Sequence, residues 1–115
     1  MLFRVVTGLS LLMMLKAEAA SHHPQEILKM LRGSPKEGAA IVKLFCASCH
    51  SPKPLIELGA PKMHQAKDWS PRIQQGGDVL LKHTQEGFGA MPARGGCFEC
   101  TDKQLELAIA ALLAK

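Results

Sequence analysis

The residues best suited to chemistry are two cysteines and a histidine in the pattern C-x-x-C-H at positions 46–50. This pattern is typical of a c-type haem attachment site. At the end of a helix, positions i and i+3 share a face, so Cys46 and Cys49 can both reach the vinyl groups of one haem and form thioether bonds. His50 would then lie beneath the iron as an axial ligand. For the motif alone, half of a zinc site and a thioredoxin-like redox pair remain alternatives.

A glycine-rich segment at positions 87–96 contains a single methionine, Met91, which small residues precede and Pro92 follows. Such a segment is ordinarily a surface loop, and a lone methionine ordinarily fills a gap in the core. In a chain with a haem motif, the segment could instead wrap over the flat ring and bring the Met91 sulfur to the iron opposite His50. Met30 lies upstream of the motif and Met63 in a proline-rich stretch, so both are poorer candidates.

Two axial ligands leave no position on the iron for a substrate. The sequence therefore predicts an electron carrier and not an enzyme, with the protein binding, burying and orienting the haem. The alternative is a haem protein with an open sixth site, which would be a peroxidase or a gas-binding protein.

Cys97 and Cys100 form a second C-x-x-C, but Thr101 follows in place of histidine, so the pair is no second haem site. A disulfide is the favoured interpretation for an exported chain. A redox-active dithiol lacks the βαβ pattern that usually carries it. A four-cysteine zinc site with Cys46 and Cys49 would span a gap of 47 residues, whereas about 15 to 20 is usual.

The N-terminus indicates export. Arg4 precedes an apolar run of eleven residues at positions 5–15, and Ala17-Glu18-Ala19 forms an A-x-A cleavage site. We expect residues 1–19 to be a secretory signal peptide cleaved after Ala19, which places the mature protein in the periplasm. The run is too short for a membrane span of about 20 residues. The alternative is a retained segment that associates loosely with the membrane.

A helix is expected to begin at Ser34, because Ser34 and Glu37 have the spacing of a capping box and Pro35 suits the first helical position. This helix delivers the haem motif at its C-terminal end. Gly38 leaves one side of it thin, which permits another helix to cross closely. Its buried face is expected to contain Ile41, Leu44 and Phe45.

Residues 51–67 are expected to form mainly a loop. A backbone carbonyl within 59–61 is expected to accept a hydrogen bond from the ring N–H of His50 that does not face the iron. A short helical turn is predicted at 70–73. A longer helix is predicted at 79–86, with Asp78 as its cap, Gly87 as its end and His83 on its exposed face. A last helix opens with a capping box at Thr101 and Gln104. Its apolar stripe comprises Leu105, Ala108, Ile109 and Leu112.

The chain of 115 residues has room for one small domain. It contains four Phe, one Trp and no Tyr, so a haem would supply apolar surface that the sequence lacks. The formal charge is +4. Because the basic residues form no run or stripe, nucleic acid is not an expected partner.

In order along the chain, these features resemble class I cytochromes c, and specifically the bacterial cytochrome c5 group. The likeness covers about residues 36–113. Its most distinctive part is Met91-Pro92 followed by Gly-Gly-Cys-x-x-Cys at 95–100. One departure is the end of the last helix, where 110–113 reads Ala-Ala-Leu-Leu and the family often has an aromatic residue.

The resemblance implies an all-α fold in which three to five helices surround one covalent haem c and the first and last helices cross beside it. It also implies His50 and Met91 as axial ligands of the iron, a Cys97–Cys100 disulfide, and Trp69 near the haem propionates. We divide the chain into the signal peptide (1–19), an N-terminal extension (20–33) and the cytochrome domain (34–115). The implied function is shuttling of single electrons between redox partner proteins of a respiratory chain, with no small-molecule substrate.

Overall fold

The structure, a computed structural model, describes residues 23–115, so the expected signal peptide lies outside the described residues. Over this range the only β-structure is an isolated bridge between Phe88 and Met91. The predicted all-α class is therefore confirmed. Within the same range, no helix combines the length and the apolar character that a membrane span requires. The helical elements are α1 (Pro24–Leu31), α2 (Glu37–Ile41), the π-helix η1 (Val42–Cys46), α3 (Ala47–His50), α4 (Ala66–Ile73), α5 (Gly77–Glu86), the 3-10 helix η2 (Ala93–Gly96) and α6 (Asp102–Leu113).

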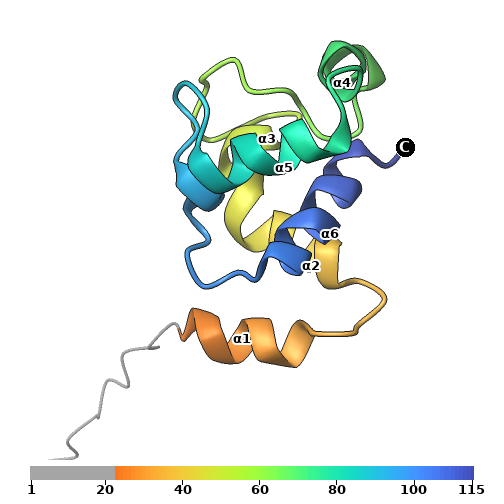
Figure 1. Cartoon of the computed structure of the whole chain (residues 1–115). Coiled ribbons are helices and arrows are strands. Elements are labelled where there is room, and N and C mark those ends of the chain that lie inside the picture. Colours follow the sequence, from red (N-terminus) through yellow and green to blue (C-terminus); the bar gives the residue numbers. More distant parts are fainter. Residues whose placement is uncertain (1–22) are drawn as a thin grey trace, which may run out of the picture.

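The most extensive helix contact is the crossing of α2 and α6 (Figure 1). It is close because of Gly38: a Cβ at this position would lie 2.3 Å from the carbonyl oxygen of Leu107. The expectation that a thin side at Gly38 admits another helix is confirmed, and the crossing is tight without an aromatic residue late in α6. The core beside it includes buried side chains from both helices, among them Ile41, Leu105, Ala108 and Leu112.

The start of the helix that carries the haem motif differs from the prediction. The helix begins at Glu37, with Lys36 and not Ser34 at its N-cap, and no capping box forms there. The Ser34 hydroxyl accepts a hydrogen bond from the Lys36 N–H at 3.2 Å. The Glu37 side chain points elsewhere: it accepts the Gly33 N–H at 2.9 Å and the Gln104 amide at 3.1 Å. The Glu37 carboxylate thus bonds to Gly33 and to Gln104 of α6, and not to the Ser34 N–H that a capping box would use.

The buried face of this helix also differs from the prediction, because residues 42–46 adopt a π-helical turn. A π-turn inserts one extra residue into the 3.6-residue register. As a result Val42 is buried with Ile41, Phe45 is only partly buried, and Leu44 is 52% exposed. The prediction of Leu44 as a core residue is therefore wrong.

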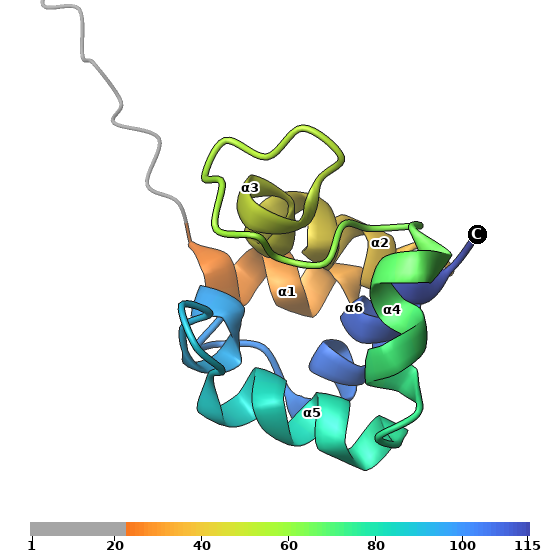
Figure 2. The same cartoon turned by 90° about the horizontal axis from the view of Figure 1, so that it is seen from above.

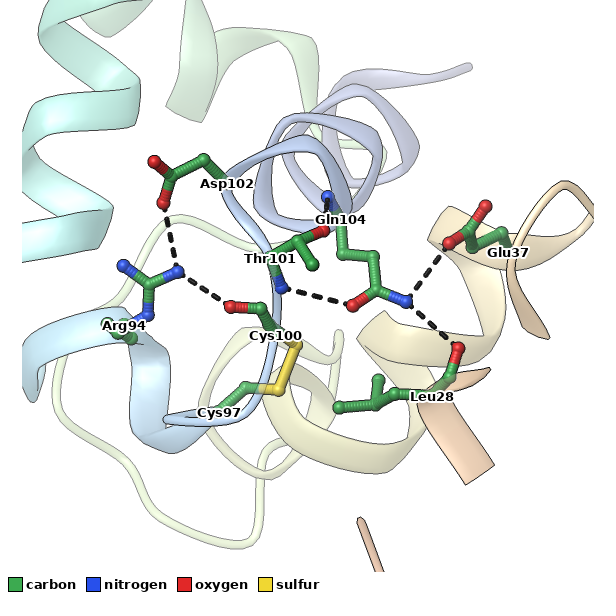
Figure 3. Close-up of a disulfide and its surroundings, with 8 residues drawn as sticks. All are labelled: Leu28, Glu37, Arg94, Cys97, Cys100, Thr101, Asp102 and Gln104. Carbon is green, nitrogen blue, oxygen red and sulfur yellow. Dashed lines mark hydrogen bonds and ion pairs between the residues drawn. A yellow bond between two sulfur atoms is a disulfide. The ribbon is translucent and has the colours of Figure 1, made fainter. Parts of the chain in front are cut away.

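Helix α1 comes from the expected N-terminal extension and packs on the same core. Its Leu28 side chain is 1% exposed and belongs to the cluster that contains the two cysteines of the disulfide. The Gln104 amide donates to the Leu28 carbonyl at 3.0 Å as well as to Glu37 (Figure 3). One buried glutamine of α6 thus connects α1, α2 and α6.

Two further helix boundaries differ from the predictions. Helix α4 begins at Ala66, one turn before the expected start, and accommodates Pro71 in its interior. Helix α5 has Gly76 at its N-cap with no capping contact from the Asp78 side chain, although it ends before Gly87 as predicted. Pro71 was expected to begin a helix, as proline often does, but here it lies in the second turn of one. Asp78 lies two residues after the N-cap of α5, within its first turn.

Helix α6 begins as predicted. The Gln104 N–H donates to the Thr101 hydroxyl at 3.1 Å and the Thr101 N–H donates to the Gln104 side chain at 3.1 Å, which forms the complete capping box. Figure 2 shows α3 and α5 on opposite sides of α6, with the segment that leads into η2 at one end of the molecule.

Candidate haem site

The two cysteines of the C-x-x-C-H motif lie at the junction of η1 and α3, and both are free thiols that are partly buried. Burial raises the pKa of the Cys46 thiol to about 11, and the charge of Cys49 adds to this rise. A redox-active dithiol needs the opposite shift, towards a thiolate at neutral pH. The raised pKa of Cys46 therefore gives no support to thioredoxin-like chemistry, and both thiols are free for covalent attachment.

The third residue of the motif, His50, is buried, with 8% of its surface exposed. Its Nδ1 lies 2.7 Å from the carbonyl oxygen of Pro61. A carbonyl only accepts hydrogen bonds, so Nδ1 carries the proton and the lone pair is on Nε2. This is the tautomer and the kind of backbone partner that metal-bound histidines use. The predicted carbonyl within 59–61 is confirmed as that of Pro61.

The loop that holds His50 is fixed on both sides. The Met63 N–H donates to the His50 carbonyl at 2.7 Å, so residues 61–63 contact both the ring and the backbone of the histidine. Lys62 between them is bonded to α4: its carbonyl accepts the Trp69 Nε1–H at 2.9 Å and its N–H donates to Asp68 at 3.1 Å.

The Trp69 ring also stacks beside the His50 ring, with 6.0 Å between the ring centroids and 23° between the planes. Trp69 is buried. Sequence reasoning missed the backbone role of Lys62 and the part played by Asp68. One signal was available in the sequence: a buried tryptophan usually needs an acceptor for its indole N–H, which here is the Lys62 carbonyl.

Met91 is placed by a tight backbone turn. Phe88 and Met91 exchange two backbone hydrogen bonds, of 2.9 and 3.1 Å, around Gly89 and Ala90. Gly87 precedes the turn with a φ of +86°, and a Cβ there would lie 2.9 Å from the Met91 carbonyl oxygen. A side chain at Gly87 would therefore disturb this turn.

The Met91 side chain is partly buried, and a Cβ at Gly95 would lie 3.5 Å from its methyl carbon. The following element, η2, packs against η1, which ends at Cys46. The fold thus brings the residues that follow Met91 against the helical turn that ends in Cys46.

His83 occupies a different position from the one predicted. It is partly buried and its ring stacks on that of Phe88, with 4.2 Å between the centroids and 22° between the planes. The prediction that His83 is exposed is wrong, because the turn at Gly87 folds Phe88 back over α5. This stack attaches the methionine turn to α5.

Cys97 and Cys100 are joined by a disulfide with an S–S distance of 1.99 Å, and both are buried. The bond leaves no thiolate at these positions for a zinc site with Cys46 and Cys49. Residues 23–115 contain no cluster of three or more His, Cys, Asp or Glu side chains that could hold a metal ion. The zinc alternative therefore has no support in the described part of the chain.

The donor set fits one covalent haem. Two free thiols at positions i and i+3 are followed by a histidine whose Nε2 carries the lone pair. A separate loop contains Met91, which is partly buried. When bound, a haem of this kind supplies a one-electron ferric–ferrous couple. The residues that would hold it are Cys46 and Cys49 by thioether bonds and His50 by its imidazole.

Comparison with known proteins agrees with this chemistry. A family model described as "Cytochrome C oxidase, cbb3-type, subunit III" matches residues 33–111. Cytochrome c5 of Azotobacter vinelandii is 34% identical over 79 residues, which cover 67% of this chain and 92% of the relative. Cytochrome c-555 of Chlorobaculum tepidum is 35% identical over 82 residues, which cover 68% of this chain and 73% of the relative.

A solved structure is similar as well. It is described as "Crystal structure of electron transfer complex of nitrite reductase with cytochrome c". Its matching chain has a TM-score of 0.60 and 32% identity, over 67% of this chain and 90% of the other.

The fold, the motif and these similarities define the class: the chain belongs to the class I c-type cytochromes. Within that class it is similar to the cytochromes c5 and c-555. It is a mono-haem electron-transfer protein that carries covalently attached haem c.

Proposed function

We propose that the iron is held between His50 and Met91 and that the protein only carries electrons. The observation that carries the proposal is the hydrogen bond from His50 Nδ1 to the Pro61 carbonyl at 2.7 Å, which leaves Nε2 free to bind iron. The turn that holds Met91 supports it, because glycine at 87 permits this turn, whereas a Cβ there would lie 2.9 Å from the Met91 carbonyl oxygen. A thioether is a soft ligand that favours the ferrous state and raises the reduction potential.

With both axial positions filled by protein, the iron has no open site for a substrate. The tasks of the chain are then to bind the haem, to exclude water and to present it to other proteins. We propose that its partners are redox proteins of a respiratory chain, which it meets one at a time through a small interface. The similarity to a cytochrome c in a complex with nitrite reductase supports protein partners of this kind.

The proposed location is the periplasm. It rests on the short basic start, the apolar run and the A-x-A site that ends at Ala19. N-terminal sequencing of the protein from an export-competent host is expected to begin at Ala20. A chain that begins at Met1 and is recovered with membranes would instead support the loosely membrane-associated form.

The ligand proposal is tested by replacing each of two methionines in the haem-loaded protein. Met91→Ala is expected to remove the far-red charge-transfer band of methionine-ligated ferric haem, to raise the affinity for cyanide by more than about tenfold, and to lower the reduction potential. Met63→Ala is the matched control, since the substitution keeps the backbone N–H through which Met63 bonds to the His50 carbonyl. It should leave all three properties nearly unchanged.

A Met91→Ala protein that behaves like the wild type would show that another residue binds the iron. A high-spin spectrum in the wild type would go further and indicate an open sixth site, which is the peroxidase or gas-binding alternative. If acid–acetone extraction removed the haem, the covalent attachment through Cys46 and Cys49 would be wrong.

A further inference from the structure

Arg94 has an unusual backbone conformation for its residue type. Its φ is +57° and its ψ is 17°, in the left-handed region, and Gly95 and Gly96 continue with φ values of +57° and +80°. Glycine adopts this region freely, whereas an arginine does so at a cost in conformational free energy. Two of the three consecutive left-handed positions are glycine, and the third is not. The arginine side chain must therefore make contacts that offset this cost.

Those contacts lead to the disulfide loop. Arg94 Nη2 donates to the Cys100 carbonyl at 2.7 Å and pairs with Asp102 at 3.0 Å (Figure 3). The Arg94 carbonyl in turn accepts the Cys97 N–H at 3.0 Å. Both cysteines are buried and joined, so the arginine is bonded at its two ends to a rigid part of the molecule.

Asp102 is an ionised partner for the Arg94 guanidinium. Hydrogen bonds from Arg94 and from Gln85 lower the pKa of the Asp102 carboxyl, which stays ionised at neutral pH. Gln85 lies in α5 and Asp102 is the first residue of α6. The guanidinium of Arg94 is thereby held between the disulfide loop and the start of the last helix.

The other side of the same turn contacts Met91. The Gly95 N–H donates to the Pro92 carbonyl at 3.0 Å, which closes the chain directly after Met91. The Met91 methyl group lies close enough to Gly95 that a Cβ added there would be in ordinary contact with it, at 3.5 Å. A change in the backbone path at Arg94 would therefore move the residues that set the position of the Met91 side chain.

We propose that Arg94 is a positioning residue for the methionine ligand: it connects the Met91 turn to the disulfide loop and so holds the thioether where iron binds it. This inference rests on the proposed ligation by Met91. The ion pair with Asp102 is by itself a poor reason for an arginine here, because the Asp102 side chain is 64% exposed and exposed ion pairs contribute little to stability. Placement of a nearby ligand is a function that such a contact can serve even where its stabilising effect is small.

The test uses the haem-loaded protein with Arg94→Gly. Glycine accepts a φ of +57° without strain, so this variant removes the side-chain contacts and leaves the backbone conformation permitted. Lys103→Ala is the matched control: it removes one positive charge from the neighbouring exposed pair with Glu106, which lies outside the Arg94 contacts. The readouts are the far-red methionine–iron band, the affinity of the ferric protein for cyanide, and the midpoint of denaturant unfolding.

Arg94→Gly is expected to weaken the band and to raise the cyanide affinity about tenfold, since a hydrogen bond from a charged group no longer holds the turn. Lys103→Ala should leave both as in the wild type. If the Arg94→Gly protein fails to take up haem, Asp102→Asn is measured in its place. This variant should also weaken the band and raise the cyanide affinity, but by a smaller amount. The proposal is overturned if the variant that is measured has a lower unfolding midpoint but keeps the wild-type band and cyanide affinity. The role of Arg94 would then be structural only.

The Met91→Ala protein distinguishes a failure of the Met91 ligand assignment from a failure of the Arg94 proposal. A wild type without the band, together with a silent Met91→Ala, overturns the ligand assignment and the role of Arg94 with it. A wild type with the band that Met91→Ala abolishes and Arg94→Gly leaves intact overturns only the role of Arg94.

Discussion

The replacement Gly38→Ala tests the packing on which the whole fold depends. A Cβ at Gly38 would lie 2.3 Å from the carbonyl oxygen and 2.7 Å from the carbonyl carbon of Leu107, whereas ordinary contact begins at 3.4 Å. Both obstructing atoms belong to the backbone of α6 and cannot rotate away. Helices α2 and α6 must therefore separate by about 1 Å, which loosens the close-packed contacts along their crossing.

The magnitude follows from two opposing effects. Overpacking of this kind costs about 1–3 kcal/mol. Replacing a helical glycine by alanine contributes up to about 1 kcal/mol in the other direction. Since the separation affects the most extensive helix contact of the fold, we place the overpacking cost at the upper end. The expected net loss in the free energy of unfolding is about 2 kcal/mol, which corresponds to a fall of roughly 10 °C in Tm.

The assay is denaturant unfolding of the haem-loaded protein, followed by circular dichroism and by haem absorbance. Gly77→Ala is the matched control, because Gly77 begins α5 and a Cβ there would meet nothing within 4 Å. This control should be neutral or slightly stabilising. Equal unfolding free energies for the two variants would refute the close crossing and the reasoning built on it.

Three further predictions concern other contacts of the fold. Replacing Cys97 and Cys100 together by serine should lower the free energy of unfolding by less than about 3 kcal/mol, because the closed loop is short, and should leave the haem spectrum intact. Thiol labelling of the unfolded, unreduced wild type should find no free cysteine. Leu28→Ala should lower the free energy of unfolding, measured with denaturant, by about 2–5 kcal/mol. Met30→Ala should lower it by less than about 0.5 kcal/mol, and this difference would show that α1 contributes to the core. Thr101→Ala should cost about 1 kcal/mol through loss of the cap, and Thr101→Ser should retain most of it; equal losses would contradict the cap.

Two similar patterns show what could be predicted from the sequence and what could not. Thr101–Gln104 and Ser34–Glu37 have the same capping-box spacing, but only the first forms the box. At Thr101 both partners are local, so the sequence contains all the information that is needed. At Glu37 the carboxylate finds the Gln104 amide, which lies 67 positions away. A competitor so distant in sequence is invisible to a local pattern.

The same distinction applies to the site. The C-x-x-C-H spacing and the need of His50 for a second partner predicted the Pro61 carbonyl within a stretch of three residues. The exposed face of α5 was predicted wrongly at His83, because the stack on Phe88 depends on how the chain turns at Gly87. The π-turn that exposes Leu44 also has no local signal, since it changes the helical register without any proline or glycine within it.

The two sides of the site are held by different kinds of contact, and this has a consequence for how the protein works. On the His50 side, hydrogen bonds to Pro61, Lys62 and Met63 attach the ligand loop to both α3 and α4. On the Met91 side, one two-residue turn and a ring stack leave fewer restraints, and a left-handed stretch follows. If Met91 binds the iron as we propose, it is the ligand on the less restrained side. The contacts of Arg94 with the disulfide loop would then add restraint where the turn itself provides little.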